Sequence, residues 1–119
     1  MERSVYEALG RYVDDLSEAV FVGIARGRVF LCGEGEVTPR DRPPLLNLFW
    51  ENGKLHVSGF WMEWGIMRGF FVEMRDCRME IRGWTIHLRS SSGEKAMKIE
   101  LHGNKGLART LADALGRCL

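Results

Sequence analysis

An Asn-Gly pair at positions 52 and 53 is the feature of this sequence that most constrains the fold. Asn-Gly is favoured in two-residue type I′ turns, because both central residues of that turn need a positive φ. The turn fixes which residues of the flanking strands face each other. The predicted pairs are Glu51 with Lys54, Trp50 with Leu55, Phe49 with His56 and Leu48 with Val57. The sequence therefore predicts an antiparallel hairpin whose core face carries Leu46, Leu48, Trp50, Leu55 and Val57.

A second hairpin is predicted between residues 83 and 101, around the polar loop 90–95. A symmetric loop pairs Leu88 with Met97, Ile86 with Ile99 and Trp84 with Leu101, which places all six on one face. The opposite face carries Thr85, His87, Arg89, Ala96, Lys98 and Glu100. This clean alternation is typical of an antiparallel sheet with one side in solvent.

Helices are predicted at both ends of the chain. Ser4 and Glu7 form a capping box, and apolar residues then recur at helical spacing over about residues 5–18. Asn104 is a plausible N-cap for a second amphipathic helix over about residues 105–117.

The segment between the helices, about residues 20–102, is predicted to be an antiparallel sheet. Alternating residues predict a first hairpin around Arg26-Gly27, and further strands are expected at 69–74 and 77–82. No strand–helix–strand alternation occurs, which argues against a doubly wound parallel sheet. We therefore predict a single α+β domain, residues 1–119, with about seven antiparallel strands in hairpins, an N-terminal helix and a C-terminal capping helix.

Seven antiparallel strands closed by one C-terminal helix resemble the pleckstrin-homology-like superfold, including its bacterial and GRAM-type relatives. The residues that carry the resemblance are 83–88, 97–101 and 107–115, which are similar to that family's last two strands and capping helix. The resemblance implies a roll or barrel of strands that hosts binding rather than catalysis. Members that bind phosphoinositides use basic residues on the first hairpin, where this chain has Arg26 and Arg28.

Charge and composition exclude several classes of protein. Lys and Arg number 17 and Asp and Glu 16, a balance that fits neither a histone-like protein nor an acidic tail. No apolar run is long enough to cross a membrane, and the acidic residues near the start do not fit a signal peptide. Cys32, Cys77 and Cys118 are too widely spaced for a disulfide framework or a zinc knuckle, so we expect buried thiols in a cytoplasmic protein.

No catalytic residue, metal ligand or cofactor is predicted. His56, His87 and His102 lack the spacing of known metal or catalytic motifs. A small enzyme or ligand carrier with an aromatic-lined pocket between the sheets remains an alternative hypothesis.

Aromatic residues are concentrated between positions 49 and 71. By strand parity, Phe49, Phe60, Met62 and Trp64 share the face opposite the core. Either the two terminal helices cover the two faces of the sheet, or these four residues form an exposed patch. Exposed aromatic and Met-rich patches mark partner interfaces. We therefore predict a non-catalytic interaction domain that binds a protein partner or a second copy of itself through these residues.

Binding of an anionic ligand is the alternative function. Arg26 and Arg28 could meet a lipid head group at a membrane surface, while Arg68, Arg75 and Arg78 lie beside the aromatic segment. Arginines next to exposed aromatics can bind single-stranded nucleic acid through phosphate contacts and base stacking. Acidic residues are interspersed among them and oppose this binding.

Overall fold

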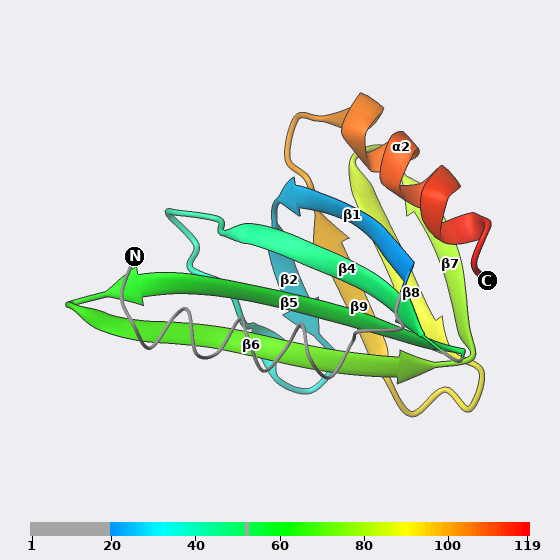
Figure 1. Ribbon diagram of the computed structural model, residues 1–119, viewed down its shortest axis with the longest axis horizontal. Helices are drawn as coiled ribbons and strands as arrows, with labels where there is room; N and C mark the ends of the chain where they lie inside the picture. The colour runs from blue at the N-terminus through cyan, green and yellow to red at the C-terminus, as the bar shows by residue number, and fades with distance from the viewer. Residues whose placement is uncertain (1–19, 52) are drawn as a thin grey trace.

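The computed structural model describes residues 20–51 and 53–119, and these residues form nine strands and one helix (Figure 1). In chain order the strands are β1 (Val20–Arg26), β2 (Arg28–Leu31), β3 (Gly35–Glu36), β4 (Leu45–Glu51), β5 (Lys54–Glu63), β6 (Ile66–Arg75), β7 (Cys77–Arg82), β8 (Thr85–Ser90) and β9 (Ala96–Glu100). The helix is α2 (Lys105–Gly116), and it follows the last strand. The predicted helix over residues 5–18 lies outside the described residues.

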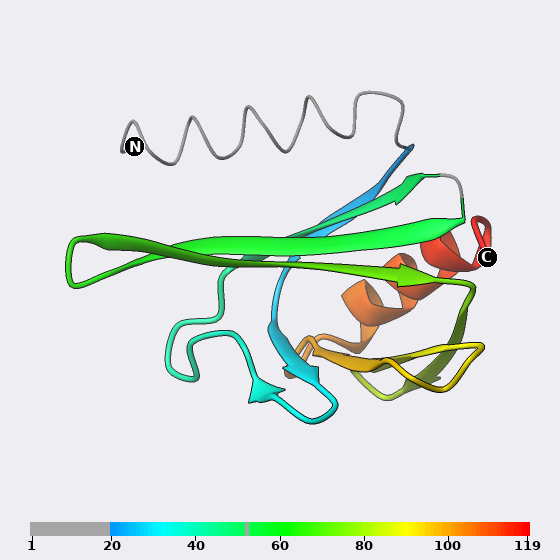
Figure 2. The ribbon, with the colours of Figure 1, turned by 90° about the horizontal axis from the view of Figure 1, so that it is seen from below.

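The strands form two antiparallel sheets that face each other as layers (Figure 2). The first sheet has the order β1-β4-β5-β6, and the second has the order β3-β2-β9-β8-β7. The core fills the space between them. Its largest fully buried apolar side chains are Val29, Leu46, Leu48, Leu55, Val57, Met74, Ile86, Leu88, Ile99, Leu101 and Leu115.

The chain passes from the first sheet to the second at Gly27. β1 pairs with β4, while β2 pairs with β9, and only Gly27 separates the two strands. A Cβ atom on Gly27 would lie 2.7 Å from Leu101 Cδ2 and 3.0 Å from the carbonyl oxygen of Glu100. A residue without a side chain is needed where backbone comes this close to a neighbouring strand. The predicted hairpin turn at Arg26-Gly27 is therefore wrong, because this glycine bends the chain between sheets.

The predicted count of about seven strands is also wrong. Among residues 20–51 and 53–119 there are nine, and the shortest of them, the two-residue edge strand β3, was not predicted. The expected roll or barrel is not matched either, since the strands form two separate sheets. At a later crossing, Asp76 has a φ of 49° and joins β6 of the first sheet to β7 of the second.

Both predicted hairpin registers are confirmed. Leu48 faces Val57 and Glu51 faces Lys54 on either side of the Asn-Gly turn. In the second hairpin, Ile86 faces Ile99 as the alternation predicts. Short loops and a one-sided apolar pattern leave a single register that buries the apolar face.

The C-terminal helix is confirmed with its cap. The backbone N–H of Leu107 donates a 2.9 Å hydrogen bond to Oδ1 of Asn104, which satisfies one free donor at the helix start. Its buried side chains are Ala108, Leu111, Ala112 and Leu115. These pack α2 against β1, β7 and β8, at one end of the space between the sheets (Figure 2).

Replacing Gly27 tests the crossing. We expect Gly27→Ala to lower the free energy of unfolding by about 1–3 kcal/mol, because the added methyl group overpacks the end of β9. Gly106→Ala is the matched control: its Cβ meets nothing closer than Asn104 Oδ1 at 3.9 Å, and it lies in α2. Alanine favours the helix, so this variant should gain up to about 1 kcal/mol. Urea unfolding measures both, and equal stabilities of Gly27→Ala and wild type would contradict the account.

Candidate functional site

The β5–β6 hairpin is longer than the sheet that supports it. β5 and β6 have 10 residues each, whereas the neighbouring strand β4 has 7. β4 begins at Leu45, one residue before the Leu46–Gly59 pair, so within the described part of the chain no strand pairs with β5 on that side beyond this point. The hairpin tip, residues 61–66, projects at the end of the molecule opposite α2 (Figure 2).

Trp64 occupies the turn of this hairpin. Trp64 and Gly65 have φ values of 53° and 75°, and Glu63 faces Ile66, so the turn has two central residues of positive φ. Tryptophan in this conformation costs about 1–2 kcal/mol, because its Cβ crowds the following carbonyl oxygen. The side chain is nevertheless 94% exposed. Because so exposed a side chain buries little area to offset this cost, the turn is a candidate functional feature.

The tip is apolar on both sides of Trp64. Ile66 is 56% exposed and Met62 is 37% exposed. Trp61, one strand position inward, is half-buried, and its indole Nε1 donates a 3.4 Å hydrogen bond to Glu63. Strand parity placed Trp64 on the outer face of the sheet. The alternation of faces applies only as far as Glu63, because the chain turns after this residue. The signal available in the sequence was Gly65 directly after Trp64 between two apolar runs.

The other two predicted partner-binding residues lie on the outer face of the first sheet. Phe60 of β5 and Phe49 of β4 are both half-buried. At the centre of this face, His56 and Ser58 are buried, with 4% and 0% exposure. The C-terminal helix α2 does not pack on this face, because it packs against β1, β7 and β8. Phe60 and Met62 lie on the same face and lead toward the hairpin tip, whereas Phe49 lies deeper in the sheet.

His56 is held in its neutral form by burial. Desolvation lowers the pKa of its imidazole, and the nearby carboxylates of Glu73 and Glu51 oppose the shift only in part. Glu51 Oε2 lies 3.8 Å from His56 Nε2, and the ring of Phe71 packs 5.5 Å from the imidazole. Neither imidazole nitrogen has a hydrogen-bond partner within the described part of the chain.

The five arginines of the anionic-ligand alternative do not share one surface. Arg26 donates a 3.0 Å hydrogen bond to the carbonyl oxygen of Pro43. Arg28 forms a two-point ion pair with Glu36, which raises the pKa of the guanidinium and lowers that of the carboxyl. Arg68 and Arg75 are exposed on β6 of the first sheet, and Arg78 is exposed on β7 of the second.

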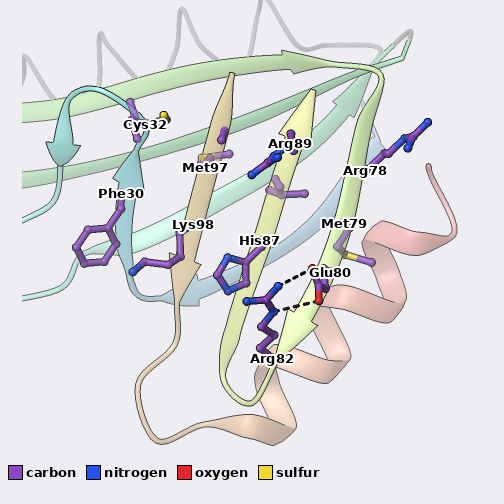
Figure 3. A pocket seen from close by; sticks show the side chains of 13 residues that line it. Phe30, Cys32, Arg78, Met79, Glu80, Arg82, His87, Arg89, Met97 and Lys98 are labelled. Atoms are coloured by element: carbon purple, nitrogen blue, oxygen red, sulfur yellow. Dashed lines mark hydrogen bonds and ion pairs between the residues drawn. The ribbon is translucent and has the colours of Figure 1, made fainter. Parts of the chain in front are cut away.

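An open pocket lies on the outer face of the second sheet (Figure 3). The polar side chains that line it come from β7, β8 and β9 and are Arg78, Glu80, Arg82, His87, Arg89 and Lys98. Phe30 and Cys32 close its other side. Three of these side chains, those of His87, Arg89 and Lys98, belong to the face that the sequence predicts to be polar and exposed. Arg78 was named in the anionic-ligand alternative, but strand alternation within one hairpin did not show that β7 brings it beside this face.

The cysteines differ in exposure. Cys77 is buried, and desolvation together with the adjacent Asp76 raises the pKa of its thiol to about 11. Cys118 is half-buried and donates to the carbonyl oxygen of Ala114. Cys32 is exposed beyond the end of β2, so the expectation that all three thiols are buried is wrong for this residue.

The interior between the sheets is filled by side chains rather than by a ligand. Leu48, Val57, Ile86 and Ile99 meet there with 0% exposure. Fully buried aliphatic side chains at this position are those of an ordinary close-packed core. This packing argues against the hypothesis of an aromatic-lined ligand pocket between the sheets.

Comparison of the chain with protein-family models and with curated proteins found no match. No group of three or more His, Cys, Asp or Glu side chains in residues 20–51 and 53–119 is placed to hold a metal ion. In the same part of the chain, no helix has the length and apolarity to cross a membrane. The hairpin tip and the pocket on the second sheet are surfaces with distinctive side-chain chemistry.

Burial of His56 predicts a loss of stability in mild acid. Because its pKa is lowered in the folded protein, the unfolded chain takes up a proton first as the pH falls below about 6.5. Stability is complete above this pH and should decline as the pH falls below it, by at most about 1.4 kcal/mol per pH unit. His56→Leu should lose this dependence and His102→Gln, at an exposed position, should keep it. Urea unfolding at several pH values measures the effect, and an unchanged slope in His56→Leu would contradict it.

Thiol labelling distinguishes the cysteines. With a disulfide reagent at pH 8, we expect a fast reaction at Cys32, because it is exposed, and a slow one at Cys77, because it is buried and almost fully protonated. Cys32→Ser should remove the fast phase and Cys77→Ser should leave it unchanged. Loss of the fast phase in Cys77→Ser instead would overturn the assignment.

Proposed function

We propose that this chain is a non-catalytic interaction domain that docks on a protein partner, or on a second copy of itself, through the β5–β6 hairpin. The observation that carries the proposal is Trp64: a tryptophan 94% exposed at the tip of a projecting hairpin. Tryptophan buried at the centre of an interface is among the residues that contribute most to binding energy. Ile66 and Met62 extend the apolar surface around it.

A second pocket continues this surface toward the body of the domain. It lies at the root of the hairpin and is lined by Phe60, Trp61 and Met62 together with prolines 39, 43 and 44. Arg26 and Arg42 line it as well. An apolar centre with a cationic rim is suited to a partner with an apolar anchor surrounded by acidic residues. The arginines then set orientation and association rate, while the aromatic residues supply most of the affinity.

The path of the chain supports a pleckstrin-homology-like fold as part of this proposal. The run β1–β2 takes part in both sheets, consecutive strands pair from β4 to β6 and from β7 to β9, and the chain ends in a helix at one end of the space between the sheets. Antiparallel strands followed by one C-terminal helix are features of that superfold, which mostly hosts binding. Fold alone does not assign function, so the proposal depends on the hairpin surface.

Trp64→Asn separates binding from folding. Asparagine accepts positive φ readily, so we expect this variant to be more stable than wild type, by up to about 1 kcal/mol, and yet to lose association. Thermal unfolding measures the first effect. Light scattering after size-exclusion chromatography measures self-association, and quantitative capture from native lysate measures binding of another protein. Leu119→Asn is the control, because Leu119 is also exposed but lies at the far end of the chain.

The outcomes distinguish the two kinds of partner. A mass that falls to that of one chain in Trp64→Asn, but not in Leu119→Asn, assigns self-association. A captured protein that Leu119→Asn retains and Trp64→Asn loses assigns a different partner. If the wild type is monomeric and captures nothing that depends on Trp64, the proposed function is wrong.

A further inference from the structure

The pocket on the outer face of the second sheet concentrates positive charge. Four of its lining side chains are cationic, namely Arg78, Arg82, Arg89 and Lys98, against the single carboxylate of Glu80. The whole chain has a formal net charge of only +1, so this concentration is local. The one carboxylate is occupied, because Arg82 donates two hydrogen bonds to it, of 3.0 and 3.1 Å. The ion pair lowers the pKa of Glu80 and leaves the other three cations to define the field of the pocket.

Two of these cations face each other. Arg78 of β7 and Arg89 of β8 are directly opposite in the sheet register, where like charges destabilise a pair of strands. Neither forms an ion pair with any residue in 20–51 or 53–119. Figure 3 shows the two side chains directed away from one another, as repulsion between them requires. A bound anion removes this repulsion, and nothing in the described core depends on either guanidinium.

The third cation is held in place. Lys98 lies beside His87 in the register, diagonally across from Arg89. Its ammonium group sits 4.3 Å from the centroid of the Phe30 ring, which forms the opposite wall of the pocket. A cation–π contact of this kind fixes the ammonium group without neutralising it. Lys98 thus presents an anchored ammonium group, and Arg89 a free guanidinium group, to the same pocket.

We infer that this pocket binds a phosphate-bearing ligand between Arg89 and Lys98, with Arg78 turning inward to complete the site. A planar guanidinium matches the oxygens of a phosphate group in a two-point contact, and several cations favour a multiply charged anion over a carboxylate. The site lies on the second sheet and does not depend on the hairpin tip. The shared chemistry is the phosphate group, which a free oligophosphate or a lipid head group can supply.

Titration of the whole chain with sodium tripolyphosphate tests the inference. By calorimetry we expect binding that weakens as sodium chloride is raised from 50 to about 300 mM, because charge screening increases. Arg89→Gln and Lys98→Gln should each weaken binding by about tenfold or more, as loss of a charged hydrogen bond implies. Arg109→Gln is the matched control, since Arg109 is exposed on α2 and lines no part of this pocket. It should bind within about twofold of wild type.

A second readout separates the ligand site from general charge attraction. In the absence of any phosphate, Arg89→Gln should raise the midpoint of thermal unfolding, because it relieves the repulsion with Arg78.

Sedimentation with phosphatidylcholine vesicles, with and without phosphatidic acid, identifies the source of the phosphate. Binding to the acidic vesicles that Arg89→Gln abolishes assigns a lipid head group, and binding of tripolyphosphate alone assigns a soluble ligand.

Three results would overturn the inference. The first is no binding of tripolyphosphate or of acidic vesicles by the wild type. The second is equal weakening by Arg89→Gln and Arg109→Gln, which would show unspecific attraction. The third is binding of a single-stranded oligonucleotide without binding of tripolyphosphate, which would indicate an extended polymer site.

Discussion

The close approach of Gly27 to the end of β9 is the contact on which the two-sheet arrangement depends. Leu101 and the carbonyl group of Glu100 occupy the space where a side chain would stand, so the chain can bend here and continue into the second sheet. One extended run therefore belongs to both sheets. The two layers share a single core, and α2 packs at one end of it against β1, β7 and β8.

The same arrangement explains why the hairpin tip is uncovered. The core extends only as far as the strands that are paired on both sides. The pairing of β5 with β4 stops near Leu46 and Gly59. β5 and β6 continue past this point as a pair, and the apolar side chains of Met62 and Ile66 near their ends are exposed. An exposed Trp64 is then a consequence of strand length, and its strained backbone is a cost that packing does not offset.

The two surfaces are chemically different and lie on different sheets. The tip of the first sheet is apolar and suits a macromolecular partner, where burial of aromatic area supplies the affinity. The pocket of the second sheet is cationic and suits a small anion, where a few charged hydrogen bonds supply it. A domain with both surfaces can respond to an anion and contact a partner without competition between the two sites.

Local pattern determined the elements whose partners are close in sequence. The strand register on either side of residues 52 and 53, the register of the hairpin in residues 83–101 and the Asn104 cap each follow from local sequence, and all three were predicted correctly. Contacts between distant segments decided the rest. The sequence predicts a hairpin turn at Gly27, but its close contact with Leu101 belongs to a bend between the sheets. The sequence places Trp64 on a sheet face, but the chain reverses at Trp64 and Gly65. The cationic pocket is completed only when β7 pairs with β8, which brings Arg78 beside Arg89, and when β2 pairs with β9, which brings Phe30 beside Lys98.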